Sequence, residues 1–327
     1  MSAQVSIQPS RPSWGTAAWR SLLYLALFLL ATLALALPVG LGYFAFRFLQ
    51  GDELEEITLH LEDALLYLNV FVGVGQFLVA LALTATWMRL LDQRGSLAEL
   101  GLRWPGRSSL LALLLGMGMA ALAVALAAAA GGFAVTGWAW EKESLADVLL
   151  VDLVGFTLLL LFMVMTDELI FRGYIRWAFA EADRIVPLAS AVLYGLYRVV
   201  AWRLMSDTGM RDASTLAMVG LSAIVSGLAL VWAWRLSKSL WSPIGLHLGW
   251  ALVTGLVFSL PVSGKTVEGL LLVRATGGLL TGGVAGPEAG LIGIMIWLAA
   301  WGLFWASQRA PYSRPGKGIG DEGQRIP

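Results

Sequence analysis

Cysteine is absent from this chain of 327 residues, and histidine occurs only twice, as His60 and His247. The absence of cysteine excludes disulfides, thiolate metal sites and a cysteine nucleophile. With two histidines in the whole chain, a histidine-rich metal site is excluded as well.

Charged residues are also scarce. They make up 13% of the chain, whereas soluble domains contain about 25%. Hydrophobic residues reach 58% and the mean hydropathy is +0.76, which indicates a polytopic membrane protein. The net charge is zero, and no basic patch interleaved with aromatic residues suggests a nucleic-acid partner.

Long apolar runs predict the fold class, because a helix needs about 20 mostly apolar residues to cross a bilayer. We expect an all-α, polytopic helix bundle of about eight spans. The fifth run spans a bilayer only if its helix continues past Arg198 toward Trp202. The runs are 21–46, 64–88, 108–140, 148–166, 185–197, 213–234, 240–263 and 289–308.

Lysine and arginine gather in alternate connections between these runs, and acidic stretches at 52–56 and 138–147 lie in the others. By the positive-inside rule, both termini are cytoplasmic. We expect a cytoplasmic segment at 1–20, without a signal-peptide pattern, N-terminal membrane helices at 21–140, a core at 145–308, and a disordered cytoplasmic tail at 309–327. Residues 95–105 resemble a short interfacial helix.

The stretch T-D-E-L-I-F-R-G-Y at 166–174 places Asp167, Glu168 and Arg172 at the end of an apolar run. In a helix, Glu168 and Arg172 share a face, while Asp167 is rotated by about 100° and faces another partner. A desolvated carboxylate here could act as a general base on water. The alternative is a juxtamembrane ion pair.

Two further polar residues interrupt apolar stretches. Arg198 lies four residues after Tyr194 on the same predicted helix face, and must snorkel or find an acidic partner. His247 lies in L-W-S-P-I-G-L-H-L-G-W-A at 240–251 and needs a hydrogen-bond partner, whether it is a ligand or a satisfied core residue. The glycine-rich stretch 281–290 is best interpreted as a turn before the last span, with Glu288 near the helix N-terminus.

Taken in this order, the motifs resemble the CAAX-protease and bacteriocin-processing family (CPBP, Abi) of intramembrane endopeptidases, over roughly residues 145–305. The first family motif, two glutamates and then arginine after three residues, corresponds here to Asp167, Glu168 and Arg172. The second has an aromatic residue and then histidine, where this chain has Arg198. The third has histidine and then asparagine, where this chain has His247 and Ala251.

The resemblance implies that Glu168 activates water and that Asp167, Arg172 and His247 belong to the catalytic site. It also implies a zinc ion, for which Asp167, Glu168 and His247 are the candidate ligands, with a metal-free site as the alternative. A fixed positive charge on Arg198 would oppose a divalent ion. We therefore hypothesise that Arg198 replaces the metal and pairs with one of the two carboxylates.

The family resemblance predicts an endopeptidase of CAAX-type processing or bacteriocin self-immunity, acting in a bacterial plasma membrane on a membrane-embedded or lipidated peptide or protein. Substitution at Arg198 and Ala251 favours weakened or lost proteolysis. The alternative is a pseudoprotease that binds such a partner without cutting it. A small-solute transporter is less favoured, because no internal repeat accompanies the stray Asp152 in the fourth run.

Overall fold

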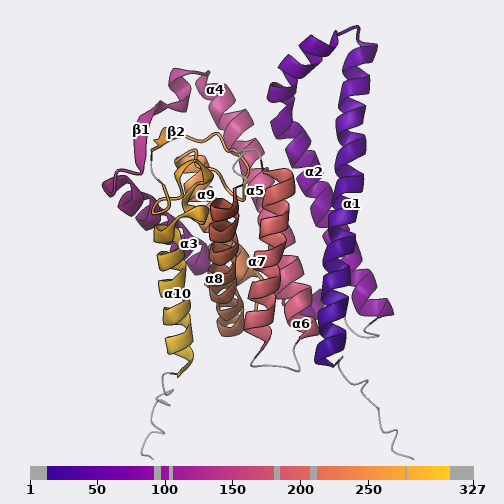
Figure 1. Ribbon diagram of the computed structural model, residues 1–327, viewed down its shortest axis with the longest axis vertical. Helices are drawn as coiled ribbons and strands as arrows, with labels where there is room; N and C mark the ends of the chain where they lie inside the picture. Colours follow the sequence, from indigo (N-terminus) through magenta and orange to yellow (C-terminus); the bar gives the residue numbers. More distant parts are fainter. Residues whose placement is uncertain are drawn as a thin grey trace, which may run out of the picture.

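The computed structural model describes residues 13–91, 97–102, 106–179, 185–206, 212–276 and 278–309. They form a bundle of long helices (Figure 1). The expected N-terminal segment lies mostly outside these residues, and so does nearly all of the expected C-terminal tail. Within 95–105, where an interfacial helix was expected, Leu97–Leu100 form a short 3-10 turn.

Ten α-helical segments and two strands follow one another along the described chain. The helices are α1 (Trp14–Leu49), α2 (Leu54–Leu90), α3 (Arg107–Ala129), α4 (Leu145–Asp147), α5 (Leu153–Glu168), α6 (Arg176–Ala178), α7 (Val186–Met205), α8 (Ala213–Ser237), α9 (Trp241–Leu252) and α10 (Leu291–Arg309); the strands are β1 (Phe133–Trp138) and β2 (Leu271–Ala275).

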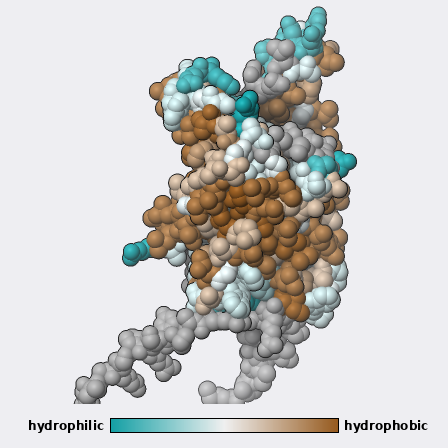
Figure 2. All heavy atoms as spheres, turned by 60° about the vertical axis from the view of Figure 1, so that its left-hand side comes forward, coloured by the Kyte–Doolittle hydropathy of each residue, from teal (hydrophilic) through white to brown (hydrophobic). Residues whose placement is uncertain are grey.

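Six helical stretches are long and apolar enough to cross a membrane, which confirms a multi-pass membrane protein. One of them joins α4, α5 and α6 into a continuous helix, Leu145–Ala178. The fifth expected span continues past Arg198 to Met205 as α7, and the seventh is the shorter apolar helix Trp241–Val257. Figure 2 shows the apolar belt, with hydrophilic residues toward the upper end of the molecule.

The third expected span is shorter than the apolar run suggested. Helix α3 ends at Ala129, and residues 133–138 form β1, which pairs antiparallel with β2. Gly131 adopts a φ of 74°, a conformation that suits glycine at a helix end. Composition alone could not separate the strand from the helix, because both are apolar.

The two described ends of the bundle, at the start of α1 and the end of α10, lie at the same end of the molecule, opposite the strands (Figure 1). The described chain thus enters and leaves the bundle at one end.

Helix α9 packs against α3 at unusually close range. A Cβ on Gly249 would lie 2.1 Å from the Leu113 carbonyl oxygen, and one on Gly116 would lie 2.1 Å from the Leu246 carbonyl oxygen. Small residues allow membrane helices to approach in this way. The contact fixes α9, and with it His247, in the centre of the bundle.

The α1–α2 hairpin is attached to the rest of the bundle near the first motif. The Tyr24 ring of α1 stacks on Tyr174, with 4.8 Å between ring centroids. The Tyr24 hydroxyl also lies 2.9 Å from the Thr84 hydroxyl on α2. These contacts belong to a single hydrophobic core that joins the hairpin to α5, α7 and α9.

Candidate active site

Glu168, the last residue of α5, is fully buried and binds two partners through the same oxygen. Its Oε1 accepts a hydrogen bond from Arg172 Nη1 at 3.2 Å and lies 2.8 Å from His247 Nδ1. A π-helical turn, Leu169–Ile175, follows directly and contains Arg172. Such turns are frequent at functional sites. The structure thus brings the first and third motifs together around one carboxylate.

Asp167 faces a different set of partners. It accepts a hydrogen bond from the Tyr194 hydroxyl at 3.3 Å, and its Oδ2 lies 4.0 Å from Arg198 Nη1. The two adjacent carboxylates are therefore held by different cations, as the helical spacing predicted. Arg198 does not reach the interface by snorkelling, because only 7% of it is exposed.

Arg172 is also fully buried and lies 4.3 Å from the centroid of the Tyr194 ring, within range of a cation–π contact. Its Nε and Nη2, and Oε2 of Glu168, have no hydrogen-bond partner among the described residues. Buried polar atoms without partners are rare in folded proteins. These atoms leave the site with unused capacity to bind water or a ligand.

Glu288 is the site residue that sequence reasoning missed. It lies in a 3-10 turn, Pro287–Ala289, before α10, as expected, but its carboxylate points into the site. Its Oε2 accepts hydrogen bonds from Arg198 Nη2 at 3.3 Å and from the Ser263 amide at 2.9 Å. Arg198 therefore links two carboxylates, one on α5 and one from the loop before α10.

The substituted third-motif position adds no polar group. Ala251 is fully buried on α9, one turn after His247, and belongs to the hydrophobic core. Its carbonyl oxygen lies 3.3 Å from the Thr254 hydroxyl. His60 lies on α2 and does not line either of the two cavities of the site.

Two cavities meet at Arg198. The larger, about 430 Å³, is lined by α1, α2, α5, α7 and the loop at Ser263 and Lys265, and includes Asp167. The smaller, about 30 Å³, is lined by His247, Tyr194 and Glu288, and has room for about one water molecule. Arg198 lines both cavities, whereas His247 lines only the smaller one.

The candidate zinc ligands do not form a metal cage. Among the described residues, the group of three whose donor atoms all lie within 4.8 Å of one another does not include Asp167, Glu168 or His247. In addition, His247 Nδ1 and Glu168 Oε1 lie 2.8 Å apart and interact with each other. Asp167, Glu168 and His247 thus do not present three converging donor atoms in this arrangement.

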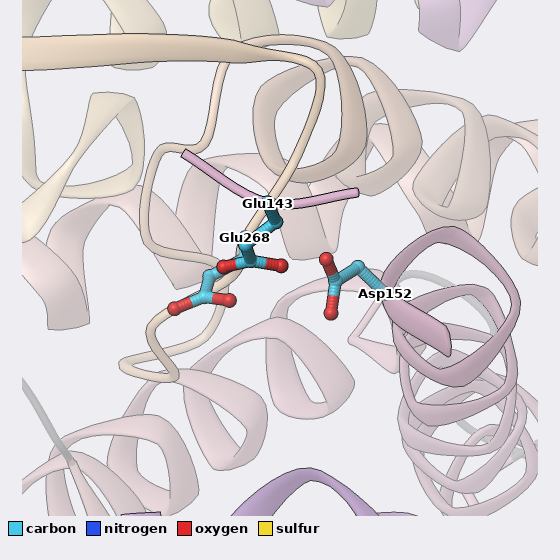
Figure 3. A group of neighbouring side chains, drawn as sticks. All are labelled: Glu143, Asp152 and Glu268. Atoms are coloured by element: carbon cyan, nitrogen blue, oxygen red, sulfur yellow. The ribbon is translucent and has the colours of Figure 1, made fainter. Parts of the chain in front are cut away.

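That group consists of Glu143, Asp152 and Glu268, which come from three segments at the strand end of the bundle (Figure 3). Burial, and then the Glu143 carboxylate, raise the pKa of Glu268 above its ordinary value. Asp152, the stray acidic residue of the fourth span, thus lies near the N-terminal end of that span, directly before α5. It is not part of the site around Glu168.

Residues 147–253 match the family model of type II CAAX prenyl endopeptidase, Rce1-like. No curated protein and no solved structure matches the chain. The matched segment contains Asp167, Glu168, Arg172, Arg198 and His247. The match confirms the family resemblance that the motifs indicated. The matched segment does not include α1, α2 or Glu288.

Proposed function

We propose that this membrane protein of the Rce1-like family binds a membrane-embedded or lipidated polypeptide in the 430 Å³ cavity, and that its proteolysis is weakened or lost. The observation that carries this proposal is the position of Arg198, which lies between Asp167 and Glu288. Arg198 thus places a fixed positive charge beside Asp167, at the position where the family motif has a histidine.

The other carboxylate is poorly placed for a large substrate. Glu168 is fully buried and does not line the large cavity, which reaches Asp167 but not His247. A scissile peptide bond in that cavity would face Asp167 and Arg198, because His247 does not line it. Binding without efficient cleavage follows from this arrangement.

An active endopeptidase is the second candidate, and one contact favours it. The 2.8 Å contact between Glu168 and His247 could hold the carboxylate as a base, with the 30 Å³ cavity supplying a water site. Arg198 would then act as a donor to a developing oxyanion. This candidate requires the substrate to pass Arg198.

A fluorescent farnesylated peptide with a CAAX-type C-terminus distinguishes the two candidates, because the family is named for cutting such peptides. We expect the wild-type chain in nanodiscs to bind this probe saturably and leave it uncut. Chromatography of the bound peptide would detect cleavage. Cleavage by the wild type that Glu168→Gln abolishes would establish the second candidate instead.

We further propose that the site works without zinc, because the donors do not converge and Arg198 already provides a positive charge beside Asp167. The purified chain should contain far less than one zinc per molecule. Elemental analysis of the detergent-solubilised chain measures this. About one zinc per chain in the wild type, lost in His247→Ala, would instead favour a metal-dependent endopeptidase.

The proposed location is a cell membrane, with both termini in the cytoplasm. The lysine and arginine distribution supports it, and the common end of α1 and α10 in Figure 1 agrees. Because the chain has no cysteine, single-cysteine variants report orientation cleanly. In intact cells, an impermeant maleimide should label Glu55→Cys and spare Gln308→Cys; the reverse pattern would invert the topology.

A further inference from the structure

Three polar side chains of the α1–α2 hairpin line the wall of the large cavity. They are Thr32 on α1 and Asn69 and Gln76 on α2, and Asp167 and Arg198 line the same cavity from α5 and α7. The hairpin lies outside the family-matched segment. Nothing in the motifs therefore assigns these three residues a role.

All three side chains lack a partner within the described part of the chain. Thr32 is 2% exposed, and its Oγ1 makes no hydrogen bond, not even to its own helix. No hydrogen bond joins the side chain of Asn69 or Gln76 to another described residue. Polar groups at membrane depth are costly when unsatisfied, and they mark pathways or binding sites.

The spacing of the two amides matches an extended polypeptide. Asn69 and Gln76 are two helical turns apart on one face, with Val72 and Gly73 of the same wall between them. Seven residues of α-helix rise about 10.5 Å. Three residues of extended chain span about 10 Å, so the two amides would meet peptide groups three residues apart.

The chemistry of a primary amide favours the same ligand. Each amide offers donors and an acceptor, and a peptide group offers one of each. An alkyl chain of a lipid offers neither and would leave both amides unsatisfied. Hydrogen bonds from these amides to a main chain would not depend on the side chains of the bound polypeptide, since the main chain is the same in every polypeptide.

We propose that Asn69 and Gln76 bind the main chain of an extended polypeptide and hold it against Asp167 and Arg198. This inference rests on the proposed function and adds the part of the protein that binds the polypeptide. The N-terminal hairpin is then a component of the binding site as well as a membrane anchor.

The test uses the fluorescent farnesylated peptide and a second version with N-methylated backbone amides, with fluorescence anisotropy measured in nanodiscs. Asn69→Leu and Gln76→Leu replace each amide by an apolar group and should each weaken binding of the first peptide roughly 3- to 10-fold. N-methylation should weaken wild-type binding similarly and add little in the double variant. Leu78→Ala, on an exposed face of α2, is the matched control and should bind as the wild type does.

A second measurement keeps the proposal testable if these variants are poorly stable. In the cysteine-free chain, Gln76→Cys should react with a small methanethiosulfonate reagent, and the bound peptide should slow the reaction. The same peptide should leave the reaction of Leu78→Cys unchanged. Equal effects at both positions would overturn the assignment of the cavity wall.

The outcomes separate this inference from the proposed function. If the peptide binds tightly and neither leucine substitution weakens its binding, the inference is overturned and the proposed function still stands. Equal binding of the N-methylated peptide, or of farnesol alone, also overturns it, because the main chain is then not what the amides bind. Failure of the wild type to bind the peptide at all overturns both.

Discussion

We expect Arg198→Ala to lower the stability of the chain more than alanine substitution of an apolar neighbour such as Val199. Arg198 lies between Asp167 and Glu288 and is nearly inaccessible to solvent. Removing one member of a buried ion pair leaves uncompensated charge and costs about 3–5 kcal/mol. Thermal unfolding in one detergent, followed for both variants, makes the comparison.

Two further variants separate charge from volume. Arg198→Met keeps most of the side-chain bulk, so a loss like that of Arg198→Ala would be electrostatic. Adding Asp167→Asn and Glu288→Gln to Arg198→Met should restore part of the stability, since no unpaired carboxylate then remains. A loss no greater than that of Val199→Ala would contradict the pairing.

The largest gain of function should come from restoring the two substituted motif positions together. We expect Arg198→His with Ala251→Asn to cut the farnesylated peptide roughly 100-fold faster than either single variant. General acid–base groups and oxyanion donors each contribute factors of about 10²–10³. The histidine would also replace the long side chain at the position that lines both cavities.

The control for this gain is Glu168→Gln in the double variant, which should abolish cleavage. Ala251 is fully buried, so the rate must be referred to the folded fraction, measured by thermal unfolding of the same preparation. If the double variant folds and stays inactive, the site lacks more than these two residues. If the wild type cuts equally fast, Arg198 is compatible with catalysis.

The split between the two carboxylates could be predicted from the sequence, because helical periodicity alone rotates Asp167 away from Glu168. The pairing of Arg198 followed from the cost of burying a lone arginine in an apolar helix. The first prediction depends on helix geometry, and the second depends on the large free-energy cost of burying an unpaired charge. The structure agrees with each of them.

Glu288 and the α1–α2 wall could not be predicted in this way. Glu288 reaches Arg198 only because the loop before α10 folds back over the bundle, a contact between residues 90 positions apart. Asn69 and Gln76 appear in the sequence as minor polar interruptions of a span. Their role depends on which face of α2 turns inward, and that is decided by tertiary packing.

The length of the hairpin has a consequence for the permeability of the membrane. Helix α1 has 36 residues and is therefore about 54 Å long, well beyond a hydrocarbon layer of about 30 Å. Thr32 lies near its midpoint. The large cavity extends from Thr32 to Ser206, Ser263 and Lys265, which also line it.

Water that fills this cavity would therefore reach roughly the middle of the bilayer. The barrier against ion leakage is then confined to the other half of the membrane. There Tyr24 and Tyr174 stack, and Tyr174 packs in turn against Trp177. The aromatic contacts that attach the hairpin to the first motif would then lie in the half of the membrane that the cavity leaves closed.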